Sequence, residues 1–290
     1  MPKWPEIAAR LKEAGGPQLD PQTAQPVGGG CIHSAWRVES PDGDCFIKVH
    51  DAGALRLFEA EACGLEMLAA AQAVRVPEVI AYAATASEAF LALEWIELGA
   101  RSAGTDGQLG SELARQHRVT HAAFGLDRDN AIGSTLQLNG WHHDWVAFFR
   151  DRRLGFQLRL ATENGFGSRL AQPGERLLDR LESFFAGAQP RPSLLHGDLW
   201  SGNAAADRYG RPVIFDPAVY FGDREADVAM TRLFGGFSSA FYSAYAEAWP
   251  LPEAHEARVD LYNLYHVLNH LNLFGAGYLG QARSLLERLL

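Results

Sequence analysis

The chain has 290 residues, of which 47% are apolar and 21% charged, an ordinary composition for a soluble globular protein of two domains or one bilobal unit. Its formal net charge of -9 argues against nucleic acid or an anionic membrane as the main partner. No window is apolar enough to span a membrane, and the start resembles an amphipathic helix rather than a signal peptide. The three cysteines, Cys31, Cys45 and Cys63, lack metal-binding spacing, so we expect no disulfide framework and a reducing, cytoplasmic setting.

Strands dominate the predicted structure of residues 1–96. A helix over 4–14 is ended by glycines and a proline, and a glycine run then separates two predicted strands. The sequence "PDGD" predicts a hairpin that leads into the strand "CFIKVH". Apolar residues at helical spacing predict a long helix over 55–71, and "VPEVIAYAAT" and "AFLALEWIEL" are two further strands.

Helices dominate after a Gly/Ser-rich junction, "GARSAGTDG". They are predicted over 107–123, 141–161, 174–187, 223–235, 237–249, 252–274 and 277–290. The sequence therefore predicts an α+β, bilobal fold with a β-rich N-lobe, residues 1–96, and a larger α-helical C-lobe, residues 97–290.

Three consecutive glycines, Gly28, Gly29 and Gly30, lie between the first two predicted strands. Glycines allow backbone N–H groups to approach and face an anion such as a phosphate. The run matches neither common phosphate-binding glycine motif, so taken alone it is better explained as a plain hairpin turn.

Lys48 lies in the apolar strand "FIKVH", where an ammonium group is costly unless it reaches a partner. The following helix offers Glu61, with Glu59 as a weaker choice. A strand lysine paired with a helix glutamate, after a glycine hairpin, is how kinases hold the α- and β-phosphates of ATP. The alternative is an edge-strand lysine that extends to water.

The stretch "LLHGDLWSGN" could be a metal site, a capped turn or a phosphotransfer loop. Asp198 and Asn203 have the D-x-x-x-x-N spacing of a kinase catalytic loop, and Asp216 follows the apolar strand "VIF". One carboxylate can take the proton of an acceptor hydroxyl, while the amide and the second carboxylate hold Mg²⁺. A capped turn explains single residues but not this ordered series, so we predict ATP-dependent phosphotransfer.

The acceptor is predicted to be small. Gly197 stands where protein kinases have an arginine, and ten residues separate Asp216 from Asp227. That spacing is too short for a peptide-binding activation segment, and no A-P-E motif follows. Asp227 is expected to brace the catalytic loop through backbone N–H groups.

These residues resemble the fructosamine kinase (ketosamine-3-kinase) family, a branch of the aminoglycoside-phosphotransferase-like, protein-kinase-like fold. The resemblance covers nearly the whole chain and includes "GGGCIHSAW", "FIKVH", "NAIGSTLQLNGWHHDWVAFFRDRRL", "HGDLWSGN", "DPAVYFGDREADVAM" and "LYHVLNHLNLFG". It implies that the protein uses ATP and Mg²⁺ to phosphorylate the 3-hydroxyl of ketosamines, which are sugar adducts of protein lysines and free amines. The phosphorylated product is unstable and loses its sugar. His33 and Leu136 depart from the family pattern, which leaves the sugar and the amine open.

The resemblance also assigns roles to residues. It implies that Asp198 is the general base and that Asn203 and Asp216 bind Mg²⁺. Lys48 and Glu61 would anchor the phosphates of ATP. It places Glu94, Trp95 and Ile96 at a hinge whose backbone reads adenine, and Trp200 and His270 in the sugar pocket. His266, four residues before His270, shares its helix face, and a hydrogen-bonded structural role is the simpler reading of this pair.

Two other functions fit the same fold. One is a kinase for another small hydroxyl acceptor, such as an aminoglycoside, choline or a different sugar. The other is a non-catalytic nucleotide-binding module, against which the intact Lys48, Asp198, Asn203 and Asp216 argue.

Cys31 directly follows the glycine run, where N–H groups and Lys48 would favour the thiolate. We hypothesise reversible oxidation there, to a sulfenic acid or to a disulfide with a second chain, so the protein is a monomer or a redox-dependent dimer. An inert residue that fills a tight turn is the alternative.

Overall fold

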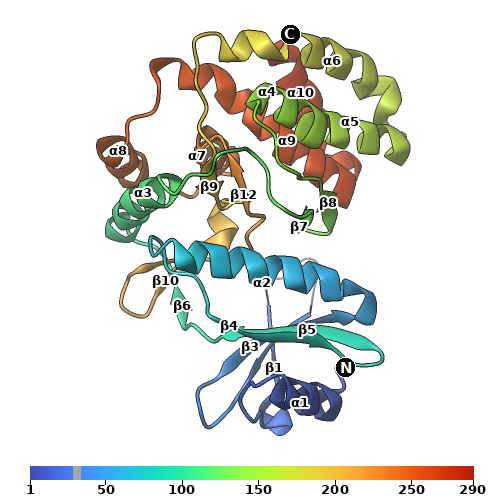
Figure 1. Cartoon of the computed structure of the whole chain (residues 1–290), viewed down its shortest axis with the longest axis vertical. Coiled ribbons are helices and arrows are strands. Elements are labelled where there is room, and N and C mark those ends of the chain that lie inside the picture. The colour runs from blue at the N-terminus through green and yellow to red at the C-terminus, as the bar shows by residue number, and fades with distance from the viewer. Residues whose placement is uncertain (29–33) are drawn as a thin grey trace.

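The computed structural model describes residues 1–28 and 34–290. A small lobe built on a β-sheet packs against a larger, mostly helical lobe (Figure 1), which confirms the predicted α+β, bilobal fold. The predictions for Gly29, Gly30, Cys31 and His33 lie outside the described residues. Gly28 lies directly after the first strand and is exposed.

A five-stranded antiparallel sheet forms the small lobe, with the strand order β1-β2-β3-β5-β4. Its strands are β1 (Gln25–Val27), β2 (Ser34–Val38), β3 (Cys45–Asp51), β4 (Val79–Ala84) and β5 (Glu88–Glu94). The predicted hairpin joins β2 to β3, and Gly43 in its turn has φ +118°, which favours glycine.

Two helices cover the two faces of this sheet. Helix α1 (Trp4–Glu13) buries Ile7 and Leu11 against one face together with Ile47 of β3. Because strand side chains alternate, Lys48 faces the other side, where α2 (Leu55–Ala70) lies across the sheet (Figure 1). Both helices match their predicted ranges closely.

The large lobe consists of helices and short strands. Its helices are α3 (Ala103–His117), α4 (Trp145–Phe148), α5 (Gly155–Ala161), α6 (Gly167–Arg180), α7 (Glu225–Leu233), α8 (Ser239–Ala248), α9 (Glu256–Phe274) and α10 (Leu279–Leu289). Its strands are β6 (Leu98–Gly99), β7 (Asn130–Ile132), β8 (Thr135–Gln137), β9 (Ser193–Leu195), β10 (Ala204–Asp207), β11 (Pro212–Ile214) and β12 (Tyr220–Gly222). Apart from β11, these strands were not predicted.

Three predicted helix ranges were inaccurate. The range 107–123 extends too far, because the chain after α3 is extended and Thr120 bridges to Ser193 of β9. In the range 141–161, the helix begins only at Trp145. A wider π-helical turn, Phe149–Leu154, lies in the middle of this helical stretch. The range 174–187 begins earlier, at Gly167, and Pro173 lies inside α6 rather than before it.

Contacts between the lobes are extensive. One hydrophobic cluster combines residues of α2 and β5 with residues of α3, β9, β11 and α8. Gly64 of α2 lies so close to the C-lobe that a Cβ there would be 3.1 Å from Val219. Strand β6 pairs with β10 of the C-lobe, so we propose that the boundary between the lobes lies just before β6.

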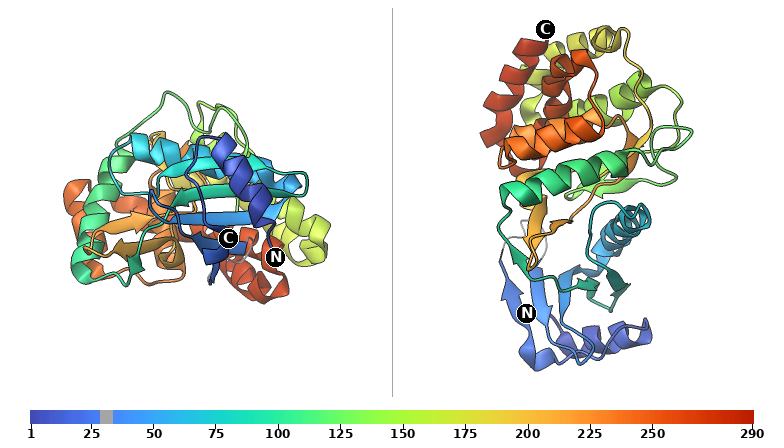
Figure 2. Two further views of the ribbon diagram at one scale, coloured as in Figure 1. Left: turned by 90° about the horizontal axis from the view of Figure 1, so that it is seen from below. Right: turned by 90° about the vertical axis from the view of Figure 1, so that its left-hand side faces the viewer.

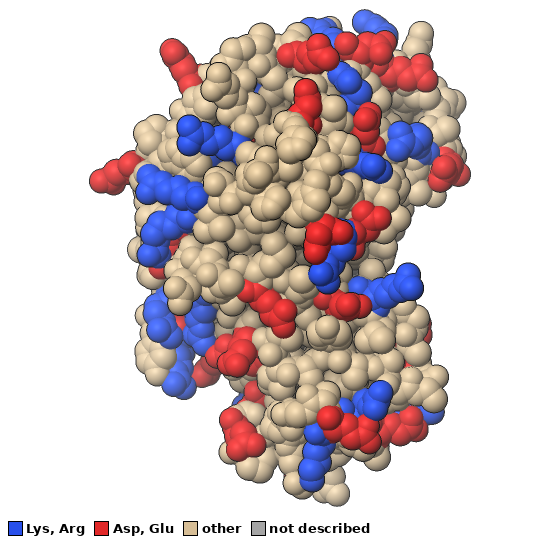
Figure 3. Space-filling model, viewed as in Figure 1, with Lys and Arg blue, Asp and Glu red and all other residues tan. Residues whose placement is uncertain are grey.

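The molecule is elongated, with α1 at one end and α6 and α10 at the other (Figures 1 and 2). Acidic and basic side chains are interspersed over both lobes on the face shown in Figure 3. Among the described residues, no helix combines the length and apolarity that a membrane crossing requires.

Candidate active site

Lys48 links the two lobes through its ammonium group. Its Nζ lies 2.7 Å from Oε1 of Glu61 on α2 and 2.7 Å from Oδ1 of Asp216. Burial alone would lower the pKa of Lys48, but the two carboxylates outweigh it and raise that pKa above its ordinary value. The predicted choice of Glu61 over Glu59 agrees with this geometry, since Glu59 is exposed.

Gly197 allows the catalytic loop to turn sharply after β9. Its φ is +84°, and a Cβ there would lie 2.0 Å from the carbonyl oxygen of Ala218. The side chain that protein kinases carry at this position therefore has no room here. Asp227 of α7 accepts the N–H of His196 at 2.7 Å and that of Gly197 at 2.9 Å, as expected from its position in the sequence.

His196 ties the catalytic loop to the segment that carries Asp216. Its Nδ1 accepts the backbone N–H of Asp198 at 3.3 Å, so Nε2 carries the proton and donates to the carbonyl of Phe215 at 3.1 Å. Burial lowers the pKa of His196, which keeps the ring neutral. The ring thus holds Asp198 and Asp216 in a fixed relative position.

Asp198 and Asn203 meet as the D-x-x-x-x-N spacing predicts. The amide nitrogen of Asn203 donates to the Asp198 carbonyl at 2.8 Å and to its carboxylate Oδ2 at 3.3 Å. Burial, followed by the charge of Asp216, raises the pKa of Asp198 to about 7. A carboxylate with that pKa can take a proton from a hydroxyl group near neutral pH.

The other oxygen of Asp198, Oδ1, is buried and faces α9. It lies 3.9 Å from Nδ1 of His266, and neither atom has a hydrogen-bond partner among the described residues. Burial, followed by the neighbouring His270, lowers the pKa of His266 to about 3, so the ring is neutral. Because Oδ1 is enclosed, Oδ2 is the oxygen that an acceptor hydroxyl can reach.

Asp216 adopts a left-handed backbone conformation with φ +57°, which aspartate and asparagine tolerate better than most residues. Its side chain is 47% exposed, in contrast to the buried Lys48 that it contacts. The backbone N–H of Phe215 donates to the Asn203 carbonyl at 3.1 Å, which brings Asn203 beside Asp216. One amide oxygen and one exposed carboxylate fit Mg²⁺, which commonly keeps water or phosphate as its remaining ligands.

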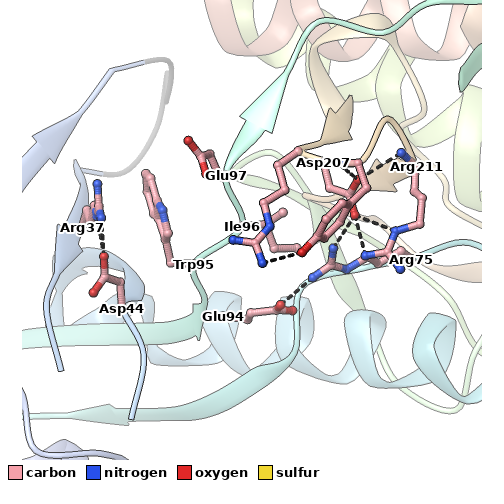
Figure 4. Close-up of a pocket in the computed structure, with 11 residues that line it drawn as sticks. Arg37, Asp44, Arg75, Glu94, Trp95, Ile96, Glu97, Asp207 and Arg211 are labelled. Carbon is pink, nitrogen blue, oxygen red and sulfur yellow. Dashed lines mark hydrogen bonds and ion pairs between the residues drawn. The ribbon is translucent and has the colours of Figure 1, made fainter. Parts of the chain in front are cut away.

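The predicted hinge residues Glu94, Trp95 and Ile96 line a pocket of about 610 Å³ (Figure 4). The N–H of Glu94 donates to the Glu78 carbonyl at 2.9 Å and that of Trp95 to the Asp44 carbonyl at 3.2 Å. These two amides are therefore engaged within the N-lobe. Among the three hinge N–H groups, that of Ile96 remains to read adenine, and the adenine-binding role of this segment stays a prediction.

Arg75 joins the hinge to the C-lobe, a connection that the sequence did not reveal. Its guanidinium lies 2.6 Å from Glu94 of β5 and 2.7 Å from Asp207 of β10, which also binds Arg211 (Figure 4). No local pattern distinguishes Arg75, because its partner in the C-lobe is distant in the sequence.

Arg101 is a second residue that sequence reasoning missed, since it lies in the stretch taken for a linker. It donates to the carbonyl of Ser201 at 3.1 Å, to that of Ala204 at 2.6 Å and to that of Gly236. Asp106 accepts from its Nε at 2.8 Å. Arg101 therefore fastens the catalytic loop to the loop after α7.

The two residues assigned to the sugar pocket lie near each other. The ring of Trp200 contacts that of Phe234 at 5.9 Å, and Phe234 contacts His270 at 5.1 Å. The Nδ1–H of His270 donates to the His266 carbonyl, 2.8 Å away, so the pair is hydrogen-bonded along one helix face as expected. Their contact with a sugar stays a prediction.

Comparison with known proteins agrees with this geometry. A family model described as fructosamine kinase matches residues 3–290. A proposed ketoamine kinase from Synechocystis sp. is 41% identical over 99% of this chain and 97% of its own length. A chloroplastic protein-ribulosamine 3-kinase from Arabidopsis thaliana is 41% identical over 90% of this chain and 80% of its own length.

Solved structures agree as well. A proposed fructosamine-3-kinase from Haemophilus somnus 129PT superposes with a TM-score of 0.89 at 27% identity, covering 99% of this chain and 97% of the other. Aminoglycoside phosphotransferases, at 15% identity, share the fold alone. The chain belongs to the fructosamine kinase family, and it is an ATP-dependent phosphotransferase with a hydroxyl group as acceptor.

Proposed function

We propose that this protein phosphorylates the 3-hydroxyl of a ketosamine, using ATP and Mg²⁺, and that the unstable product then loses its sugar. The observation that carries the proposal is the meeting of Asp198, Asn203, Asp216 and Lys48 where the two lobes face each other. The relatives that act on ketoamines and on protein ribulosamine support the choice of acceptor.

Asp198 acts as the general base. Its Oδ2 accepts the proton of the 3-hydroxyl group. The hydroxyl oxygen meanwhile forms a bond to the γ-phosphorus of ATP, and the bond between that phosphorus and the oxygen of the departing ADP breaks. The carboxylate is held for this task by His196 and Asn203, and its raised pKa of about 7 makes it a stronger base than an exposed aspartate.

The remaining polar residues hold the phosphates. Lys48, positioned by Glu61, would bind the α- and β-phosphates, because its ammonium lies where the two lobes face each other. The amide oxygen of Asn203 and the carboxylate of Asp216 would hold Mg²⁺. When bound, Mg²⁺ neutralises charge on the phosphate oxygens.

The C-lobe favours a small acceptor over a folded peptide segment. Residues 217–231, which follow Asp216 and include β12 and the start of α7, are all buried. In protein kinases the segment after the corresponding aspartate is long and binds peptide. Here it is packed into the core, so the acceptor group must enter from between the lobes.

The test is a panel of ribulose-, erythrulose- and fructose-adducts of lysine, with ATP consumption as the readout and the phosphate position determined by NMR. We expect turnover of at least one adduct and a phosphate on the 3-hydroxyl. Turnover of choline or an aminoglycoside, with none of any ketosamine, would refute the proposal.

A further inference from the structure

Five aromatic side chains form a continuous row that begins beside the catalytic aspartate. We call this row the aromatic rim; it consists of Trp200, Phe234, His270, Phe274 and Tyr278. Neighbouring ring centroids are 5.9 Å apart for Trp200 and Phe234, 5.1 Å for Phe234 and His270, and 5.6 Å for His270 and Phe274. Tyr278 closes the row, 5.1 Å from His270 and 6.2 Å from Phe274.

The rim includes two exposed phenylalanines. The sequence has sixteen phenylalanines, all within the described residues, and the two exposed ones are Phe234 and Phe274, at 38% and 49%. Single exposed apolar residues are common, but two exposed phenylalanines joined through the half-buried ring of His270, in a row that begins beside the proposed base, indicate a binding surface.

The backbone on each side of the rim is shaped to present these rings. Gly275, with φ +86°, ends α9, and the short turn Ala276–Tyr278 brings the Tyr278 ring back onto His270. At the other end, Phe234 precedes the Gly235–Gly236 turn, which Arg101 fastens to the catalytic loop through the carbonyls of Gly236 and Ser201. Phe234 is thus positioned by the same contact that positions the catalytic loop.

The rim is also continuous with the proposed base. Trp200 follows Asp198 by two residues, and His266, which faces Asp198, lies one helical turn before His270. A substrate whose hydroxyl reaches Asp198 must therefore extend past these rings as it leaves the site.

We propose that the aromatic rim binds the amine part of the ketosamine, namely the protonated secondary amine and the aliphatic chain of a glycated lysine. This inference rests on the proposed function. In a ketosamine the amine is close to the 3-hydroxyl along the sugar chain, so the amine comes to lie beside Trp200 and Phe234 when the hydroxyl meets Asp198. Aromatic faces attract ammonium groups, and aliphatic methylenes pack on the same rings.

The neutral state of His270 suits a cationic ligand. Burial lowers its pKa, so at neutral pH the ring carries no charge that would repel an ammonium group. The outer residues Phe274 and Tyr278 are then placed to contact the lysine chain rather than the sugar. They are expected to determine which amines are accepted.

The test compares two ketosamines that carry the same sugar, one on the side chain of Nα-acetyl-lysine and one on methylamine. The quantity to compare is kcat/KM for the lysine adduct divided by kcat/KM for the methylamine adduct. In the double variant Phe274→Ala, Tyr278→Ala we expect this ratio to fall by ~5-fold or more. Phe274→Leu, which keeps apolar bulk but removes the aromatic face, should give part of that loss. Tyr82→Ala, which truncates an exposed aromatic residue on β4, should leave the ratio unchanged.

The outcomes separate the two proposals. The shared sugar is one that the wild-type protein accepts in the panel above; if it accepts none of the three, the proposed function fails, and the rim assignment falls with it. If the wild type is active but the double variant keeps the wild-type ratio, or loses activity equally on both adducts, the rim assignment alone is wrong. Thermal unfolding of each variant, expected within a few degrees of wild type because Phe274 is exposed and Tyr278 packs only at the margin of the core, checks that the fold is intact.

Discussion

The two halves of the candidate active site differ in how their charged groups are partnered. On the nucleotide side, Lys48 contacts two carboxylates, Glu61 and Asp216, so the cation is fully compensated. On the acceptor side, Asp198 has one amide donor at its carboxylate, and its other oxygen faces a neutral histidine, His266. One side holds paired charges, and the other holds a buried carboxylate without a cation.

This difference matches the two tasks of a phosphotransferase. Paired charges keep Lys48 protonated and oriented until phosphate oxygens arrive as additional partners. An unpaired, buried carboxylate has a raised pKa and gains stability when it takes a proton. The contrast predicts that substitutions on the acceptor side abolish chemistry, whereas substitutions on the nucleotide side also change binding of ATP.

The largest expected effect comes from Asp198, the proposed base. Asp198→Asn should reduce kcat by ~10²- to 10⁴-fold, because the variant cannot accept the hydroxyl proton. ATP binding, measured by calorimetry, should stay within about twofold of wild type. The same change at an exposed hairpin aspartate, Asp42→Asn, serves as the control and should leave kcat unaltered. A kcat for Asp198→Asn near that of wild type would remove Asp198 from the mechanism.

Most of the residues that the sequence revealed have partners that are near in the chain or fixed by regular structure; Asp216, whose partner Lys48 is distant, was predicted from motif order instead. Asp198 and Asn203 lie in a single loop, and Lys48 and Glu61 lie on a strand and the helix that follows it. Short spacing limits where such side chains can point, so a motif is enough to predict that they meet.

The residues that the sequence did not reveal have distant partners. Arg101 binds carbonyls of Ser201, Ala204 and Gly236, and backbone carbonyls carry no side-chain signal. Similarly, the approach of His266 to Asp198 depends on how α9 packs under the catalytic loop, which no local pattern specifies. The inaccurate end of the helix over 107–123 has the same cause, because pairing of Thr120 with Ser193 overrides local helix preference.

The second prediction tests the metal site on the nucleotide side. Asp216→Asn should remove most of the Mg²⁺-dependent part of ATP affinity and lower kcat by ~10²-fold or more, since an amide is a weaker ligand than a carboxylate. Asparagine tolerates φ +57°, so the backbone should keep its conformation. ATP titrations with and without Mg²⁺ measure the effect. If Mg²⁺ strengthens ATP binding by the same factor in the variant and in wild type, Asp216 does not hold the metal.

The third prediction uses the raised pKa of Asp198. Between its ordinary pKa of 3.8 and about 7, the folded protein binds a proton at Asp198 that the unfolded chain releases. This group therefore stabilises the fold most at low pH, and that contribution is lost as the pH rises through this window. Asp198→Asn removes the buried charge, so without ligands we expect it to stabilise the protein at pH 8 by on the order of 1–3 kcal/mol.

Denaturant unfolding at pH 8 and at pH 5 measures this effect. The gain from Asp198→Asn should be larger at pH 8, where the wild-type carboxylate is ionised, than at pH 5, where it is mostly protonated. A gain that is equal at the two pH values would show that the pKa of Asp198 is not raised. The Asp42→Asn control should show no such pH-dependent difference.

The smallest expected effect is at the inner part of the aromatic rim. His270→Ala should raise KM for the ketosamine by ~3- to 10-fold and leave KM for ATP within about twofold, because His270 contacts Phe234 and Tyr278 and lies away from Lys48. Its pKa is lowered by burial, so the ring is neutral and its loss should act through shape and hydrogen bonding rather than charge. His143→Ala, at an exposed position before α4, is the matched control. Equal increases in both KM values would instead indicate that His270 supports the fold of the catalytic loop and does not touch the acceptor.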